Sequence, residues 1–283
     1  MIANAWWEEW WTFLLAALVL SIAVVGLVRA KTRSLEKELR RLEEALVARS
    51  KELAAAHREL SEATVTDLLT GLRNRRFFSA SIDGDVAAAR RVFTDPAGGP
   101  APKNRDLLFF LVDVDRFKEV NDVFGHHAGD RVLVEVARRL QGVVRRSDSL
   151  VRWGGEELLI ISREGERNEA HVLAERALVA VSREPFELGD NRLLWRTCSI
   201  GWAPFPWLRE HPDAVSYGDV LRLADRALHL AKSEGRHRAV GVLPLGTETG
   251  PPETIAAALK NPVLTGESAT VRLIRSVGPD VPA

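Results

Sequence analysis

Four consecutive residues, Gly154, Gly155, Glu156 and Glu157, lie between two short apolar segments and could do chemistry. Two glycines allow a tight turn and let a ligand approach the backbone closely. Successive residues of a strand point to opposite faces, so the two carboxylates would diverge. Taken alone, the pattern is equally that of an ordinary hairpin with solvated acids, so it does not yet predict a site.

A second acidic group follows an apolar run. Residues 107–112 read Leu-Leu-Phe-Phe-Leu-Val, which predicts a strand buried on both faces, and Asp113, Val114 and Asp115 come directly after it. A carboxylate at the end of a buried strand is costly unless it is paired, hydrogen-bonded or bound to a metal. If this strand neighbours the hairpin, Asp113 and one hairpin glutamate would suit Mg²⁺, with waters and phosphate oxygens completing its shell. Alternatively, Asp113 or Asp115 caps the helix that follows.

These residues must be positioned by helices and strands that alternate over residues 67–243. Besides the hairpin strands at 149–153 and 158–162, the patterns predict strands at 107–112, 193–203 and 240–243, and helices at 116–124, 129–142, 169–182 and 217–233. Residues 95–103 read as a loop within this domain. The predicted fold class is α+β, a sheet of mixed strand direction flanked by helices.

Residues 1–30 predict a short outer stub and one transmembrane helix. Residues 12–28 are uncharged and follow a tryptophan-rich start that ends at Trp11, close to the ~20 apolar residues that cross a bilayer. Arg29 and Lys31 come next, so the positive-inside rule places the N-terminus outside the bacterial inner membrane and the rest in the cytoplasm. A cleaved signal peptide is the alternative, but it requires the reverse order of charges.

Residues 31–66 predict a signalling helix that dimerises as a parallel coiled coil. Leucines occupy one heptad frame at Leu35, Leu39, Leu42, Leu46, Leu53 and Leu60. Arg49 and Ala56 are weaker positions of the same frame. The alternative is a single solvated helix that acts as a spacer, which so narrow an apolar stripe would stabilise poorly.

Composition excludes some classes of protein. Lys+Arg and Asp+Glu are equal at 39 each, so nothing indicates a basic nucleic-acid binder, and nucleic acid is not an expected partner. The single cysteine, Cys198, excludes an intrachain disulfide and reads as a small core residue. Residues 244–283 are rich in Gly, Pro, Thr and Ser and predict a mostly disordered tail, with a short helix possible at 253–259.

Four segments together resemble the GGDEF family of diguanylate cyclases, in a GGEEL variant of its signature. The segments are Asp67–Phe77, Asp113–Asp130, Arg152–Leu158 and Ala231–Arg236, in the family's order and spacing. The resemblance covers about residues 67–243 and implies the nucleotidyl-cyclase-like form of the mixed sheet. It also implies the activity, in which two GTP molecules become cyclic di-GMP and two pyrophosphates. Each domain of a homodimer would hold one GTP, and each 3′-hydroxyl would attack the other's α-phosphate.

The resemblance assigns the metal and catalytic roles. Asp113, the backbone carbonyl of Val114 and Glu156 match the ligands of Mg²⁺ (or Mn²⁺). Metal ions would neutralise the phosphates and acidify the attacking hydroxyl. Glu156 or Glu157 would take the 3′-hydroxyl proton, and the sequence does not separate these two roles.

The resemblance also assigns substrate contacts. The matching positions are Leu72, Phe117, Lys118, Asn121, His126, Asp130, Lys232 and Arg236. Asn121 and Asp130 match guanine-reading positions, with His126 beside them. Leu72 and Phe117 would line the base pocket, and the three basic residues would contact phosphates. The alternatives are ordinary turn or cap residues, two core side chains and a solvated helix end.

A further pair matches the family's product-inhibition site. Arg145 and Asp148 form an Arg-x-x-Asp set before the hairpin, and Arg176 is a candidate second contact. Arginine can stack on guanine and grip phosphate, while the aspartate can accept hydrogen bonds from the guanine edge. The alternative is a turn with a surface ion pair of little energetic value. Cyclic di-GMP would then be both product and inhibitor.

The sequence departs from the family pattern at several places, among them Leu158 for the final Phe and His237 where an asparagine is common. None of these removes a proposed ligand. The sequence therefore predicts an active enzyme. The alternative is a catalytically silent module that binds GTP or cyclic di-GMP and relays a signal.

Overall fold

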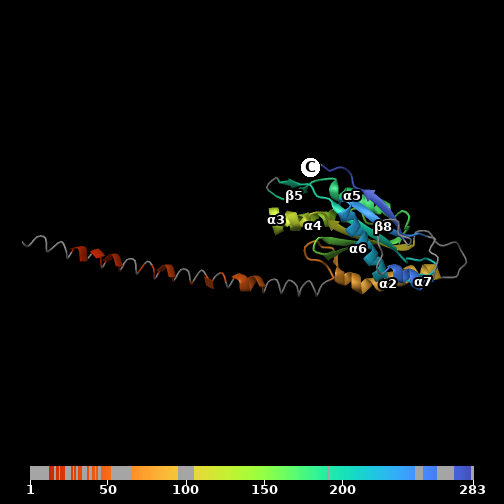
Figure 1. Cartoon of the computed structure of the whole chain (residues 1–283), viewed down its shortest axis with the longest axis horizontal. Coiled ribbons are helices and arrows are strands. Elements are labelled where there is room, and N and C mark those ends of the chain that lie inside the picture. Colours follow the sequence, from red (N-terminus) through yellow and green to blue (C-terminus); the bar gives the residue numbers. More distant parts are fainter. Residues whose placement is uncertain are drawn as a thin grey trace, which may run out of the picture. The chain divides into compact units, whose positions relative to one another are not determined.

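The computed structural model describes residues 65–94, 105–189, 192–245, 251–259 and 271–281, with short helical pieces between residues 13 and 51. The chain divides into two units, Met1–Leu60 and Ser61–Ala283 (Figure 1). Every residue to which the sequence assigns chemistry lies in the second unit.

The described residues of the first unit are helical. Among the residues that can be described, no helix is long and apolar enough to cross a membrane. This finding overturns the expected single-pass anchor in the bacterial inner membrane with an outer N-terminus. A span needs about 20 consecutive apolar residues in one helix.

The heptad leucines fall mostly outside the described residues. Leu46 lies within them, in a helical piece, and is 70% exposed. The other five, Leu35, Leu39, Leu42, Leu53 and Leu60, lie outside them. The coiled coil therefore stays a prediction.

The second unit is built on a seven-stranded sheet with the order β1-β3-β4-β2-β7-β8-β9. The strands are β1 (Arg73–Asn74), β2 (Asp106–Val114), β3 (Ser149–Gly154), β4 (Glu157–Gly165), β7 (Cys198–Phe205), β8 (Arg238–Pro244) and β9 (Val271–Val277). A small second sheet pairs β5 (Phe186–Glu187) with β6 (Leu193–Leu194). The pairs β1–β3 and β7–β8 are parallel and the other neighbours are antiparallel, so the predicted mixed sheet is confirmed.

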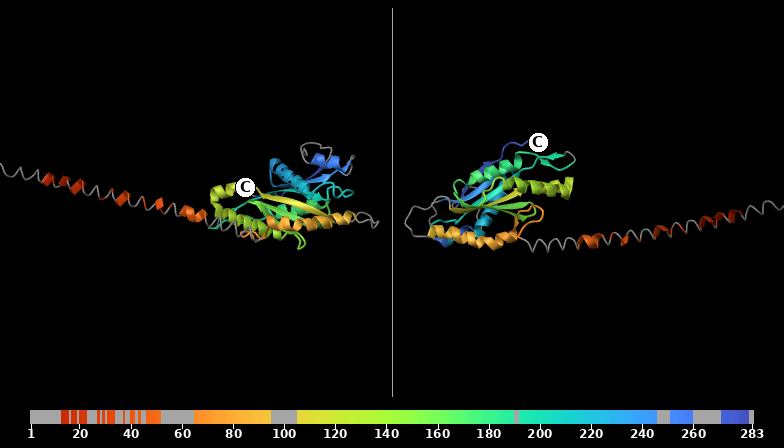
Figure 2. Two further views of the ribbon diagram at one scale, coloured as in Figure 1. Left: turned by 90° about the horizontal axis from the view of Figure 1, so that it is seen from below. Right: turned by 180° about the vertical axis from the view of Figure 1, so that it is seen from behind.

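Helices cover both faces of this sheet (Figure 2). They are α2 (Arg75–Thr94), α3 (Phe117–Phe124), α4 (His126–Gln141), α5 (Ala170–Ser182), α6 (Tyr217–Ser233) and α7 (Pro252–Leu259). Alternate residues of β2 explain the two layers. Leu108 and Phe110 pack with α4 and α5, whereas Leu107 and Phe109 pack with α2 and α6. Every residue of β2 is buried, as the continuous apolar run predicts.

The C-terminal residues differ from the expected disordered tail. Val271–Val277 forms β9, which pairs antiparallel with β8 over its whole length. The helix α7 agrees with the short helix that the sequence allows, and Ile255 and Leu259 enter the core on the α2 and α6 side. A seven-residue edge strand after a Gly- and Pro-rich stretch gives little periodicity. The pairing of β9 with β8 joins two segments separated along the chain, so the tail sequence alone does not reveal it.

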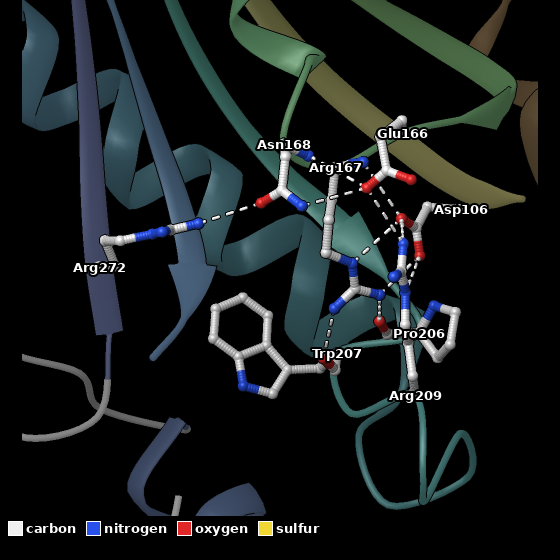
Figure 3. Close-up of polar contacts among 8 residues, drawn as sticks. All are labelled: Asp106, Glu166, Arg167, Asn168, Pro206, Trp207, Arg209 and Arg272. Carbon is white, nitrogen blue, oxygen red and sulfur yellow. Dashed lines mark hydrogen bonds and ion pairs between the residues drawn. The ribbon is translucent and has the colours of Figure 1, made fainter. Parts of the chain in front are cut away.

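A buried ionic cluster holds the first residue of β2, Asp106, at the end of the strand away from Asp113. The carboxylate of Asp106, which is fully buried, accepts hydrogen bonds from Arg167 (2.6 and 3.0 Å) and Arg209 (2.6 Å) (Figure 3). Arg167 also donates to the backbone carbonyls of Pro206 (2.6 Å) and Trp207 (3.0 Å). The loops after β4 and β7 are thereby tied to the start of β2. No local sequence pattern predicts this cluster, because its residues are far apart in the chain.

Candidate active site

Asp113 lies near the end of β2, between the two strands that flank it. Its register partners are Glu157 on β4 and Ser199 on β7. Only 5% of the residue is exposed. The condition that the sequence set, that the buried strand and the hairpin are neighbours, is therefore met.

The hairpin of β3 and β4 brings Gly154 opposite Glu157, with Gly155 and Glu156 between them in the turn. The sequence predicts a turn that needs the conformational freedom of glycine. The structure differs, because neither Gly154 nor Gly155 has a positive φ. A Cβ added at Gly155 would meet no atom within 4 Å. The missing side chain instead leaves open space above the turn, where a ligand can approach the backbone.

Arg152 holds this turn in place, a role that the sequence pattern does not predict. Its guanidinium donates to the Gly155 carbonyl (3.0 Å) and to the Asp67 carboxylate (3.0 Å). Asp67 also accepts from the Thr70 hydroxyl (2.6 Å). Burial raises the pKa of Asp67, but the hydrogen bonds from Thr70 and Arg152 outweigh it and the net pKa is lowered. The segment entering the domain is thus linked directly to the hairpin turn.

Acidic groups and one lysine converge at Asp113. Burial raises the pKa of Asp113 to about 6; Lys232 acts to lower it, and the charges of Glu156 and Glu157 act to raise it. Lys232 Nζ lies 2.7 Å from Asp113 Oδ2. This lysine, which the sequence assigns to a phosphate, thus pairs with the predicted metal ligand.

The chemistry of this donor set fits a small hard cation. Across the described part of the chain, no group of three or more His, Cys, Asp or Glu side chains is arranged to hold a metal. The predicted set differs in kind, because it combines the carboxylates of Asp113 and Glu156 with the Val114 carbonyl. Mg²⁺ commonly takes one or two carboxylates and keeps waters or phosphate oxygens. The ammonium of Lys232 marks the same place as attractive to a positive charge.

Asp115 does not cap the next helix. Its carboxylate accepts from the hydroxyls of Thr197 (2.6 Å) and Ser199 (2.7 Å) and from the backbone N–H of His237 (3.1 Å). The N-cap of α3 is Arg116, in a left-handed conformation (φ 55°) and without a side-chain cap bond. Asp115 therefore joins the start of β7 and the loop after α6 to the end of β2.

The predicted base-binding residues meet where α3 faces α4. A Cβ added at Gly129 would overlap Asn121 Oδ1 and lie 3.1 Å from Phe117 Cζ. The side chains of Asn121 and Phe117 therefore share one place above Gly129. Phe117 and Leu72 are both buried in the core cluster on the α4 side, so their core reading holds.

The other predicted substrate contacts are accessible. Asp130 follows Gly129 directly, is half-buried and lines a groove between α4 and β5. Lys118 on α3 and His126 at the start of α4 are exposed. Arg236 is exposed in the loop after α6, and its backbone N–H donates to Ala231. All of these positions can reach a ligand from solvent.

The residues predicted for product inhibition line one pocket. Arg145, Asp148 and Arg176 share it with apolar residues of α5. The Asp148 carboxylate accepts from the backbone N–H groups of Arg145 (2.9 Å) and Arg163 (3.2 Å), which shapes the turn before β3. Arg176 donates to the Val143 carbonyl (3.0 Å). The structure therefore brings together three residues that the sequence placed 31 positions apart at most.

Comparison with known families gives a match over more than half of the chain. Residues 64–238 match the family described as "Diguanylate cyclase, GGDEF domain". Diguanylate cyclase DosC of Escherichia coli is 36% identical over 172 residues, which cover 61% of this chain and 34% of that protein. The response regulator PleD of Caulobacter vibrioides is 38% identical over 181 residues, covering 64% and 36%. The match thus spans about a third of each of these relatives.

Solved structures share the fold. The coiled coil and GGDEF domain of DgcB from Caulobacter crescentus, in complex with c-di-GMP, has a TM-score of 0.54 at 26% identity and covers 71% of this chain and 98% of that one. Diguanylate cyclase SiaD from Pseudomonas aeruginosa, in complex with its activator SiaC, has a TM-score of 0.52 at 30% identity, covering 83% and 86%. The central mixed sheet flanked by helices is common to them.

Proposed function

This chain belongs to the GGDEF domain family, and from that premise we propose that it is a diguanylate cyclase. It would condense two GTP molecules into cyclic di-GMP and two pyrophosphates as a homodimer. One observation carries the proposal. The buried carboxylate of Asp113 is registered with Glu157 and electrostatically coupled to Glu156, so acidic groups converge where a hairpin turn leaves open space. In an ordinary hairpin the acidic side chains are solvated and do not lie beside a buried carboxylate.

Asp113, the Val114 carbonyl and Glu156 would hold Mg²⁺ (or Mn²⁺). When bound, the cation would neutralise the phosphates and acidify the attacking 3′-hydroxyl. Glu156 and Glu157 are half-buried at the turn, and either can accept the hydroxyl proton. Lys232 pairs with Asp113 and offsets part of its charge, and the flexible side chain of Lys232 can turn to a phosphate.

Guanine recognition would rest on Asn121 of α3 and Asp130 of α4, two helices that approach each other closely at Gly129. An amide and a carboxylate can pair with both the acceptors and the donors of the guanine edge. His126, Phe117 and Leu72 would complete the base site. Lys118 and Arg236, both exposed, would contact phosphates together with Lys232.

Two such sites must face each other, because one hairpin can hold one GTP. We attribute this pairing to the coiled coil predicted for residues 31–66. The solved relative DgcB was crystallised with its own coiled coil, which supports this assignment. A change in the register of the two helices would then bias the productive dimer.

Product inhibition would act at the pocket of Arg145, Asp148 and Arg176. The complex of DgcB with c-di-GMP supports a binding role for the product in this family. Replacing Arg145 with Ala should leave the initial rate unchanged, since the pocket lies apart from Asp113. It should abolish the slowing of the reaction as cyclic di-GMP accumulates. Equal inhibition of both forms would remove this part of the proposal.

The proposal is tested by incubating the purified full chain with GTP and Mg²⁺ and separating the nucleotides. The expected products are cyclic di-GMP and pyrophosphate in a ratio of one to two. GTP that binds but is recovered unchanged would instead favour the silent module that relays a signal. No binding of GTP would contradict both.

A further inference from the structure

The strand β9 lies beyond the region that defines the family. The family match ends at residue 238, where β8 begins, and Val271–Val277 adds a strand to the outer edge of β8. In this pairing Val240 is opposite Arg275 and Arg238 is opposite Val277. The C-terminal end of β9 therefore reaches the loop that joins α6 to β8. That loop carries Arg236 and follows Lys232.

An ion pair links β9 to this loop. Arg275 Nε donates to both carboxylate oxygens of Glu234 (3.1 and 3.0 Å), and its Nη2 donates to Glu234 Oε1 (2.9 Å). Glu234 is the C-cap of α6, two residues after Lys232. The hydrogen bonds of this pair lower the pKa of Glu234 and raise that of Arg275, so each residue stabilises the charge of the other. The fork geometry fixes the position of Glu234 more closely than a single contact would.

A second set of contacts involves His237, the residue that stands where the family commonly has asparagine. Its backbone carbonyl accepts from the Gly278 N–H (2.9 Å), and its Nε2 donates to the Pro279 carbonyl (2.7 Å). A Cβ added at Gly278 would overlap the His237 ring. On its other side, the His237 N–H donates to Asp115, next to the predicted metal ligands. His237 is thus held between the tail and the active site.

The backbone of this loop needs such support. Gly235, Arg236 and His237 all have positive φ, at 115°, 61° and 48°. Positive φ is unfavourable for residues other than glycine, and two of the three are not glycine. Such conformations persist when the surroundings over-determine them. Here the surroundings are Asp115 on one side and β9 with Gly278 and Pro279 on the other.

We propose that β9 together with Gly278 and Pro279 is a brace that fixes the loop 234–237 and the end of α6 before it, so that Lys232 and Arg236 face the phosphates of GTP. Arg275 and His237 are its positioning residues. The inference rests on the proposed function, because it assigns the loop to GTP. A simpler role, protection of the exposed edge of β8, would not require contacts that run past the strand to the loop.

The test compares two charge reversals on the same strand of the full chain. Arg275→Glu breaks the brace. Arg272→Glu is the matched control, since Arg272 is opposite Leu243 at the other end of β8 and bonds to Asn168 (3.1 Å). We expect Arg275→Glu to weaken the binding of a non-hydrolysable GTP analogue with Mg²⁺ by about fivefold or more, because a phosphate contact is misplaced. Adding Glu234→Arg should restore most of the affinity.

Amide hydrogen exchange across residues 232–238 should also quicken in Arg275→Glu and not in Arg272→Glu. If the wild-type chain binds the analogue and both variants bind it equally well, the brace is wrong and the proposed function stands. Equal weakening by both variants, without rescue by Glu234→Arg, also overturns the brace, since it indicates general damage to β9. If the wild type does not bind the analogue, the proposed function fails and the brace fails with it.

Discussion

At Asp113, two requirements oppose each other. A cation site needs a charged carboxylate, yet burial and the charges of Glu156 and Glu157 disfavour that charge. Lys232 compensates in part. Carboxylates whose charge is disfavoured in this way are frequent at functional sites. The same negative field that disfavours the charge of Asp113 attracts a cation or a proton. The charge on Asp113 should therefore cost folding stability.

We expect this cost to show as a pH dependence without divalent cations. The pKa of Asp113 rises from 3.8 to about 6 on folding, so between these values the folded state keeps a proton that the unfolded state has lost. The free energy of unfolding should then fall as pH rises from 4 to 6, by up to ~3 kcal/mol. Asp113→Asn should lack this fall.

Urea unfolding in EDTA at several pH values measures the effect. Asp213→Asn, which removes an exposed carboxylate, is the control and should follow the wild type. If the free energy of unfolding changes with pH in the same way for the wild type and Asp113→Asn, the charge of Asp113 does not lower folding stability. Adding Mg²⁺ at pH 8 should stabilise the wild type and leave Asp113→Asn unchanged, because a ligand stabilises the state that binds it.

The sequence predicted which side chains gather at the site better than it predicted their partners. Asp113 and the hairpin acids follow from a buried run that ends in a carboxylate. The ion pair of Asp113 with Lys232 joins residues 119 positions apart, and the hold of Arg152 on Asp67 joins residues 85 apart. Such pairs depend on how α6 packs on the sheet and on how the segment before β1 lies beside β3, which no local pattern encodes. The same reason hid the contacts of Asp115.

Among the elements, β2 is fixed at both ends. At one end Asp115 binds β7 and the loop after α6, and at the other Asp106 binds Arg167 and Arg209. Between these ends the strand is wholly buried. A strand fixed in this way holds Asp113 at one depth relative to the hairpin, which a binding site for a small cation needs.

We expect Asp106→Asn to destabilise the domain by about 3 kcal/mol or more. The change leaves the nearly buried guanidinium of Arg167 without its counter-charge, and breaking a buried pair on one side costs about this much. Chemical denaturation against the exposed control Asp213→Asn measures it. A loss as small as that of the control would mean that the cluster tolerates a neutral partner.

The elements differ in how far they could be predicted. The helix at 217–233 appears at its expected place because its apolar residues recur with helical spacing. The buried strand appears close to its expected place because its apolar run is continuous. The helix at 169–182 also appears close to its expected place, as α5. The tail strand β9 was not predicted, since seven residues at a sheet edge alternate weakly. The membrane helix was predicted from hydropathy and is contradicted among the described residues.

For the molecule as a whole, activity should depend on how two chains are held together. The heptad leucines are the proposed contact. Replacing Leu39, Leu42 and Leu46 together with Gln should lower the rate of cyclic di-GMP formation at fixed protein concentration, by about tenfold or more, since two GTP sites must meet. Raising the protein concentration should recover part of the rate.

Analytical ultracentrifugation and the product assay, run on the same samples, check this expectation. Leu27→Gln, at an exposed position upstream of the heptads, is the control. An unchanged rate per chain across dilution, for both the wild type and the triple variant, would contradict a dimer made by these leucines.

If the hairpin and Asp113 form one catalytic site, the rate of cyclic di-GMP formation from saturating GTP and Mg²⁺ should depend on Glu156. The measurement compares Glu156→Ala with Glu253→Ala, which removes an exposed glutamate of α7. We expect a wild-type rate for Glu253→Ala and a loss of at least about a hundredfold for Glu156→Ala. Equal rates in the two variants would contradict this expectation.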